Sequence, residues 1–310
     1  MPQPRIQEVH VDKAITNMAI RYTNTLFIAE QLAPVITVTK QSDKYFIYDK
    51  AYWFMDDADD DRAPGTRAPR SGYKLSTGDY LLKEIAHATP VPWKIADNAD
   101  DPLRMYEDAS AYSMQMCLLR RERRTATDLF ATGKWATDVT GGTDFTKWSD
   151  FADSDPANDI ATGQDAIQQN TGQLPNTLVI GWEVWQQLRQ HPDGLDRYKH
   201  TQTGILTPEM VAQWLDIDRL IIGRAIYNSA REGQTASMSY IWGKDALLSF
   251  VTSAPSRTEA SAAYIFQKGD IETRRFVEEP EKQDVVEVTL ETDPRVTASD
   301  AGYFFSGAVA

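Results

Sequence analysis

The sequence has one cysteine among its 310 residues, Cys117, so no disulfide can form within the chain. No run approaches the length of a membrane span, and the first fifteen residues lack the apolar stretch of a secretory signal. Positive charge is also scarce, since 32 Lys and Arg stand against 45 Asp and Glu, a net charge of −13. These absences predict a protein that is not secreted, has no membrane partner and does not read nucleic-acid sequence.

Motifs of catalysis are absent as well. The sequence contains no Walker-type glycine loop, dinucleotide glycine fingerprint, serine elbow or paired-histidine zinc helix. His191, Asp193, Asp196 and His200 lie close together in a Pro-Gly loop, which favours ordinary loop polarity over a metal site with converging ligands. Cys117 has no accompanying His pattern and is predicted to be a packed side chain. We predict no enzyme, and no catalytic, metal or cofactor site.

The stretch from Asp101 to Thr132 predicts one long helix. Asp101 suits the N-cap, Pro102 the first helical position and Gly133 a left-handed exit, and such a helix would run about 45 Å. The four arginines between residues 120 and 124 favour ion pairs with neighbouring segments over phosphate contacts. The predicted core of the helix is an apolar seam of Met105, Ala109, Tyr112, Met116, Leu119, Ala126 and Phe130.

Residues 35–92 are expected to form a long excursion of two β-like arms. Residues 35–40 and 44–55 are rich in β-branched and aromatic side chains, and residues 73–93 form the return arm. An isolated two-stranded hairpin is only marginally stable in water. It therefore needs a surface to lie on, either the core of its own chain or a neighbouring subunit.

The tip of this excursion, from Asp56 to Arg70, is charged. It lacks the alternating ligands of a calcium loop, which favours a solvated loop. The opposite charges either pair within the loop or form an electrostatic clasp between subunits, and the sequence leaves both readings open. The candidate clasp residues are Asp56, Asp57, Asp59, Asp60, Asp61, Arg62, Arg67 and Arg70.

The second half of the chain predicts a sheet covered by helices. A helix is expected from Pro156 to an exit at Gly172, and helices and strands alternate over residues 176–223. The helix that follows Gly181 is expected to stop at Pro192, and Thr207 is expected to cap the next one. From residue 227 onward the sequence is mainly β.

The sequence resembles a known family. KQSDKYFIYDK, then RAPGTRAPRSGYKLSTGDYLLKEIAHATPVPW, then NADDPL entering a long helix are similar to the major capsid proteins of tailed bacteriophages, which have the Hong Kong 97-type coat fold. PNTLVIGWEVWQQLRQHPDGLDRYKHTQTGILTPEMVAQWL followed by LIIGRAIYN resembles their axial domain, and DPRVTASDAGYFF resembles their ending. The resemblance covers nearly the whole chain in the expected order.

The resemblance implies an α+β fold with an N-terminal arm, an extended β-hairpin loop, a peripheral domain with a long spine helix, and an axial α/β domain. The expected divisions are an arm at 1–34, the extended loop at 35–92, a peripheral domain at 93–173 with the spine helix at 101–132, the axial domain at 174–258, peripheral strands at 259–296, and a C-terminal segment at 297–310 that returns to the axial domain.

The resemblance also implies a function. Subunits of the family form pentamers and hexamers of an icosahedral shell around packaged double-stranded DNA, so the expected location is the virion, after assembly in the cytoplasm of a bacterial host. Acidic net charge keeps the anionic DNA from adhering to the wall. Scaffolding, portal and decoration proteins are possible separate partners, and scaffolding is expected as a separate chain or not at all. Lys50, Lys74 and Lys83 lie in the extended loop, but no covalent cross-link is predicted.

Three other functions compete with this one. An encapsulin-like nanocompartment has the same fold and would enclose enzymes, but no cargo-binding groove is recognisable. An α/β enzyme built on residues 174–223 lacks a matched nucleophile, base or cofactor motif. Another virion part, such as a tail-tube or head-completion protein, is often shorter and lacks the spine helix.

Overall fold

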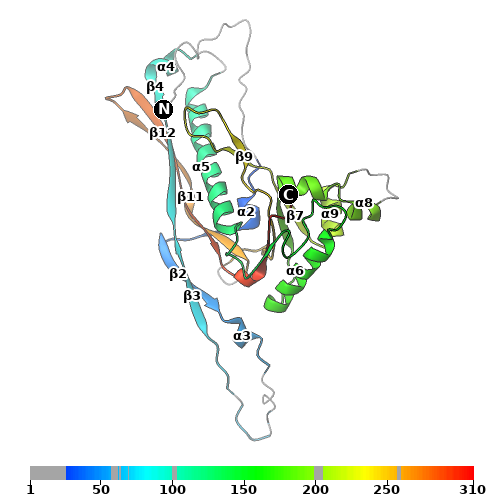
Figure 1. Ribbon diagram of the computed structural model, residues 1–310. Helices are drawn as coiled ribbons and strands as arrows, with labels where there is room; N and C mark the ends of the chain where they lie inside the picture. The colour runs from blue at the N-terminus through cyan, green and yellow to red at the C-terminus, as the bar shows by residue number, and fades with distance from the viewer. Residues whose placement is uncertain are drawn as a thin grey trace.

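The computed structural model describes residues 26–56, 62, 64–68, 70–99, 103–198, 205–256 and 260–310. Two sheets organise this part of the chain, with one long helix beside the first and a hairpin that projects away from both (Figure 1). The four-stranded sheet has the order β1-β11-β12-β4, formed by β1 (Val35–Thr37), β11 (Ala263–Glu278), β12 (Gln283–Val296) and β4 (Lys83–Pro92).

The long helix α5 (Met105–Leu129) lies along β4 and β12. Its 25 residues span about 37 Å. Asp101 and Pro102, predicted to begin the helix, lie outside the described residues, and the predicted start is wrong because Leu103 and Arg104 are not helical. The helix begins at Met105, and the acidic residues Glu107 and Asp108 of its first turn lie at the positive end of the helix dipole, where negative charge is stabilising.

The predicted end of the helix at Thr132 is also wrong. The chain leaves the helix at Phe130, and the indole Nε1 of Trp135 donates to the carbonyl oxygen of Leu129 at 2.8 Å. This buried indole satisfies one of the carbonyls that a helix end leaves unpaired. Gly133 does adopt a left-handed conformation, with φ of 77°, but in the turn beyond the helix.

The five-stranded sheet confirms the predicted alternation of helices and strands. Its order is β5-β13-β10-β6-β7, formed by β5 (Thr137–Thr140), β13 (Gly302–Ser306), β10 (Ala246–Ser249), β6 (Thr177–Gly181) and β7 (Arg219–Gly223). The helices beside it are α6 (Pro156–Thr171), α7 (Trp182–Leu188), α8 (Pro192–Arg197) and α9 (Pro208–Trp214). Pro192 begins α8 rather than only ending the helix before it.

The two faces of the five-stranded sheet have different partners. Leu178, Ile180 and Leu248 pack in one cluster with buried residues of α6, α7 and α9. Val179, Leu247 and Phe304, which alternate with them, pack in a second cluster with Leu129 and Phe130 at the end of α5. The end of the long helix therefore joins the two sheets through a shared core.

The projecting hairpin pairs β2 (Ser42–Tyr48) with β3 (Leu75–Leu81). Residues 50–53, predicted as strand, instead form the short helix α3 (Lys50–Trp53), because the side chain of Asp49 accepts from the Ala51 N–H and caps it. Strand β4 belongs to the four-stranded sheet, so the free hairpin is shorter than the predicted loop at 35–92. The remaining elements are α2 (Ala29–Leu32), α4 (Trp93–Asp97), β8 (Ile226–Asn228), β9 (Met238–Tyr240) and the 3-10 turn η2 (Ser299–Ala301).

Candidate functional site

The hairpin β2–β3 has one face on the protein and one face in solvent. Its register places Tyr45 and Tyr80 on the same side, where both rings stack on Phe266 of β11, with centroids 5.4 and 4.7 Å away. Residues directly opposite one another share a face. The other face therefore holds the exposed apolar side chains Phe46, Tyr48, Leu75 and Leu81.

Aromatic side chains extend this exposed face toward the tip. The rings of Tyr48, Trp53 and Tyr73 contact one another with centroids 5.6 to 6.3 Å apart. Trp53 and Tyr73 are each 63% exposed, whereas the ring of the neighbouring Phe54 turns toward Gly172 at the end of α6. Monomeric soluble proteins seldom expose apolar groups so close together, and such patches mark interaction sites. We name the set Phe46, Tyr48, Trp53, Tyr73, Leu75 and Leu81 the hairpin patch.

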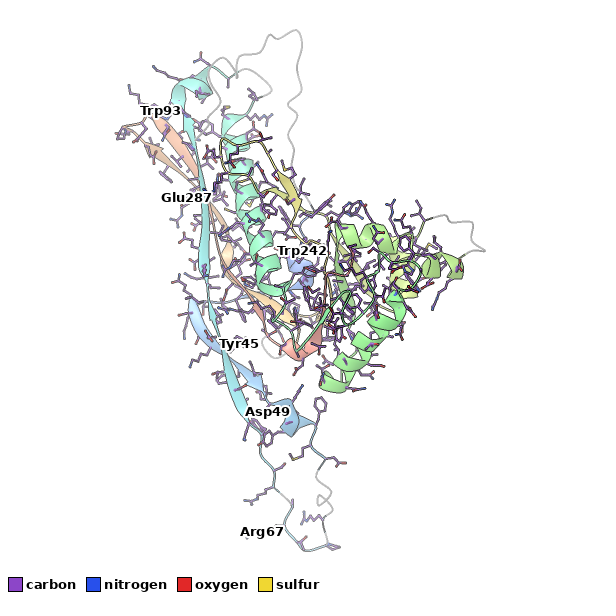
Figure 2. All side chains as sticks on the ribbon, viewed as in Figure 1. Tyr45, Asp49, Arg67, Trp93, Trp242 and Glu287 are labelled. Atoms are coloured by element: carbon purple, nitrogen blue, oxygen red, sulfur yellow. The ribbon has the colours of Figure 1, made fainter. Side chains whose placement is uncertain are left out.

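The charged tip lies beyond the hairpin patch. Asp56, Arg62, Arg67 and Arg70 are exposed, and Arg67 lies far from both sheets (Figure 2). The other predicted clasp residues, Asp57, Asp59, Asp60 and Asp61, are outside the described residues. The described half of the tip therefore presents three guanidinium groups to solvent.

The predicted seam of the long helix is only partly correct. Ala109, Ala126 and Phe130 are buried, whereas Met105, Met116 and Leu119 are half-buried. Tyr112 is 52% exposed and its prediction as core is wrong, because its ring sits edge-on to His87 at the border of the sheet.

Small and polar side chains form the buried stripe that the prediction missed. The hydroxyl of Ser113 lies 2.7 Å from that of Thr89, and the Cys117 thiol donates to the Val288 carbonyl oxygen at 3.3 Å. Such short side chains let the helix backbone approach the sheet closely, and hydropathy alone does not reveal them. Cys117 is a packed residue as predicted, and burial raises the pKa of its thiol.

Three of the four arginines of the long helix contact neighbouring segments, and two of them form the predicted ion pairs. Arg121 pairs with Glu30 of α2 at 2.7 Å, and Arg124 pairs with the buried Asp293 of β12 at 2.7 Å. Arg123 stacks on the Tyr227 ring, with its guanidinium carbon 4.1 Å from the ring centroid. These contacts are structural, and they hold the helix to three other elements.

The described residues offer little for chemistry. His191 is fully buried and its Nε2 bonds to the Ser154 hydroxyl at 3.0 Å, while His200 lies outside the described residues. Within the described ranges no three His, Cys, Asp or Glu side chains are grouped to hold a metal. No described helix has the length and apolar character to cross a membrane.

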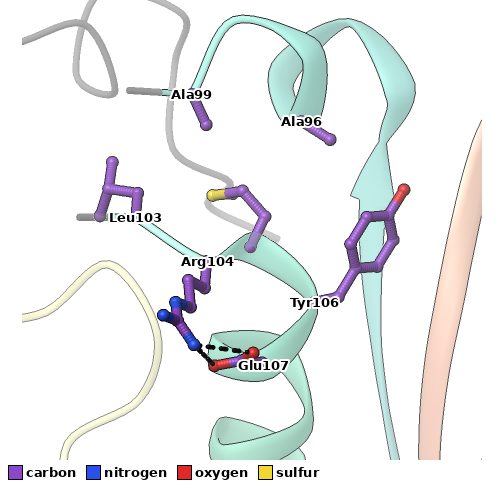
Figure 3. Close-up of a pocket in the computed structure, with 7 residues that line it drawn as sticks. Ala96, Ala99, Leu103, Arg104, Tyr106 and Glu107 are labelled. Carbon is purple, nitrogen blue, oxygen red and sulfur yellow. Dashed lines mark hydrogen bonds and ion pairs between the residues drawn. The ribbon is translucent and has the colours of Figure 1, made fainter. Parts of the chain in front are cut away.

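A hollow of about 250 Å³ lies between α4 and the start of α5 (Figure 3). Ala96, Leu103 and Met105 line its apolar part, and Arg104 pairs with Glu107 at 3.2 Å on its side. An exposed ion pair of this kind contributes little energy and offers no catalytic group. The hairpin patch is therefore the candidate site, and the interaction that it predicts is with another protein surface.

These features together define a class of protein. A long helix lies along a sheet, an α/β unit packs on the end of that helix, and a hairpin continues the sheet into solvent (Figure 1). This arrangement is the Hong Kong 97-type coat fold.

Comparison with known proteins supports this assignment. The chain is 28% identical to the major capsid protein of Burkholderia phage BcepMu and 29% identical to that of Pseudomonas phage JBD67, over 96% and 97% of each chain respectively. No family model matches the chain. The resemblance to tailed-phage major capsid proteins is thus confirmed.

Solved structures share the fold. A phage-related protein from Bordetella bronchiseptica RB50 superimposes with a TM-score of 0.72 at 23% identity, covering 93% of both chains. The capsid protein of Cyanophage P-SCSP1u gives 0.64 at 12% identity, over 97% of this chain and 93% of that one. The SrpI encapsulin from Synechococcus elongatus PCC 7942 gives 0.58 at 11% identity, over 96% and 92%.

Proposed function

We propose that this chain is the coat subunit of a tailed-phage head. It assembles as pentamers and hexamers into an icosahedral shell that encloses double-stranded DNA, and its location is the virion after assembly in the host cytoplasm. The observation that supports this proposal is the hairpin patch, an apolar face that this fold leaves in solvent. Curated relatives named as major capsid proteins support a structural role rather than an enzymatic one.

The hairpin patch needs a partner for a physical reason. Three of its members, Phe46, Trp53 and Tyr73, are each at least 63% exposed in the isolated subunit. Covering one large apolar side chain gains about 1.5–3 kcal/mol, so the patch supplies several kcal/mol when a neighbouring copy covers it. Loss of rotational and translational freedom opposes association, and repetition of the contact around a closed shell offsets that cost.

The expected divisions of the chain belong to the same proposal. Residues 1–34 act as an arm and 35–92 as the extended loop, whose return strand β4 lies in the four-stranded sheet. The peripheral domain contains α5 and 259–296, and the axial domain contains 174–258 with 297–310. Strand β5 and helix α6, expected in the peripheral part at 93–173, instead belong with the five-stranded sheet of the axial part. The net charge of −13 keeps packaged DNA from adhering to the wall. Portal and decoration proteins are proposed as separate partners, and scaffolding is either a separate chain or absent.

The charged tip is proposed as an electrostatic clasp between subunits. Arg62, Arg67 and Arg70 are exposed, and Arg67 lies at the far end of the hairpin, away from both sheets (Figure 2). Each exposed pair contributes only about 0–1 kcal/mol, but a shell repeats it many times. Pairing within the tip is the competing arrangement.

An encapsulin-like nanocompartment is the second candidate, because an encapsulin shares the fold over nearly the whole chain. The contents of purified shells distinguish the phage-head proposal from the nanocompartment proposal. Shells purified from cells that produce the intact phage hold double-stranded DNA under the first proposal, and they hold a cargo enzyme under the second.

Electron microscopy of the expressed chain tests assembly itself. Closed shells or capsomer rings are expected for wild type. Phe46→Ser removes the most exposed ring of the hairpin patch, which is 69% exposed, and should lower shell yield severalfold at unchanged subunit melting temperature. Phe266→Ser, which alters the buried side of the same hairpin, should lower the melting temperature instead. Wild type that stays a folded monomer at high concentration refutes the proposal.

A further inference from the structure

Glu122 is a buried carboxylate at the meeting point of three segments. It is 1% exposed, on the part of α5 nearest α2. Its Oε1 accepts from the Ile28 N–H at 2.8 Å and from the Trp242 indole Nε1 at 2.8 Å, and its Oε2 accepts from the Ala29 N–H at 3.0 Å. One side chain therefore joins the long helix to the segment at residue 28 and to the strand region beside the five-stranded sheet.

The hydrogen bonds of Glu122 cap the start of α2. Ile28 and Ala29 stand at the start of α2, where the N–H groups have no partner within the helix. The side chain of Ile28 supplies no cap, so the carboxylate from α5 serves as the cap of α2. The direction of α2 is thus fixed from outside the helix, by a residue 93 positions away in the chain.

The charged residues around Glu122 have separate partners. Arg121 pairs with Glu30, Arg123 stacks on Tyr227, and Arg124 pairs with Asp293. Burial raises the pKa of Glu122, while the two backbone donors, the Trp242 indole and the charge of Arg121 oppose that rise. A buried acid is costly, and an apolar residue would stabilise the fold at least as well. A buried charge that accepts three directed hydrogen bonds specifies geometry, which an apolar side chain does not.

We propose that Glu122 is a positioning residue that fixes the course of residues 26–33 of the proposed arm, by holding the start of α2 against α5 and Trp242. The consequence for shell assembly depends on the proposed function, whereas the local effect does not.

Hydrogen exchange followed by mass spectrometry tests the local effect on the full chain. Glu122→Gln keeps the shape but leaves one acceptor oxygen, so at least one of the Ile28 and Ala29 amides loses its hydrogen bond and should exchange about tenfold faster. Glu122→Asp keeps the charge but withdraws the carboxylate, and it should give the same local change. Glu107→Gln, which alters an exposed acid of the same helix, is the control and should change neither amide.

The expected result is faster exchange confined to residues 26–33, with the centre of α5 unchanged and shell yield reduced. Unchanged exchange at Ile28 and Ala29 overturns the proposal. Faster exchange throughout α5, or failure of both Glu122 variants to fold, also overturns it, because Glu122 would then stabilise the fold as a whole. Wild type that forms no shells refutes the proposed function and leaves the exchange result standing.

Discussion

A carboxyl group placed on the buried stripe of α5 tests which face of the helix meets the sheet. Cys117 is fully buried, and its Sγ lies 3.3 Å from the Val288 carbonyl oxygen. Met116 precedes it and is half-buried. The matched pair Cys117→Asp and Met116→Asp therefore places the same group at two exposures, about 100° apart around one helix.

The expected losses of folding stability in the two variants differ enough to measure. Full burial raises the pKa of a carboxyl by up to about 3–5 units, and each unit is about 1.36 kcal/mol, so Cys117→Asp costs roughly 4–7 kcal/mol near neutral pH. Domains have total stabilities of about 5–15 kcal/mol, so this loss approaches unfolding. Met116→Asp, with water available on one side, should cost about 1 kcal/mol.

The loss of stability in each variant is measured by circular dichroism melting and by soluble yield, at about pH 7 and about pH 5. The introduced carboxyl has a folded-state pKa above its unfolded value of about 3.9, so the folded chain binds the proton more tightly. The deficit of Cys117→Asp is therefore full above the folded-state pKa and shrinks as the pH falls. A Cys117→Asp chain that melts within a few degrees of wild type, or a Met116→Asp chain that loses as much, refutes the proposed orientation.

Two further predictions concern the tip and a close contact. Arg62→Glu should leave subunit melting unchanged but lower shell yield, more at low salt where repulsion is poorly screened, and equal yield at low and high salt would refute the clasp. Gly302→Ala would place a Cβ 2.1 Å from the Trp135 ring and should lower stability by about 3 kcal/mol in a denaturant titration. Gly72→Ala, with no atom within 4 Å, is its control and should change little.

Local signals in the sequence predicted the α/β half well. Asp155 accepts from the Asn158 N–H and Pro156 opens α6, while Gly172 ends it with φ of 70°. Thr207 likewise caps α9 through the Met210 N–H. Each of these features depends on residues within one turn of the helix, which is why the sequence shows them.

The long helix was harder to predict from the sequence, because its boundaries and its buried face depend on residues far away in the chain. Trp135 ends it, and Ser113 and Cys117 are buried because strands β4 and β12 lie against them. Hydropathy places Tyr112 inside and Ser113 outside, the reverse of the structure. Glu122 shows no sequence signal at all, since a charged residue among four arginines is typical of an exposed helix face.

The candidate site was predicted in part. The need of the hairpin for a second surface followed from its length and composition, and the exposed ring of Phe46 agrees with that need. Which rings face solvent depends on the pairing of β2 with β3, and the sequence does not show that register.

The join between β3 and β4 has a mechanical consequence. Only Leu82 separates the two strands, so the chain from Leu75 to Pro92 runs as one nearly continuous strand of about 60 Å, at roughly 3.3 Å per residue. Its first part belongs to the hairpin and its second part to the sheet beneath α5. A force on the tip is therefore transmitted along the covalent backbone into that sheet, with no intervening loop to absorb it. Displacement of the hairpin by a neighbouring molecule would thus strain the sheet on which the long helix packs.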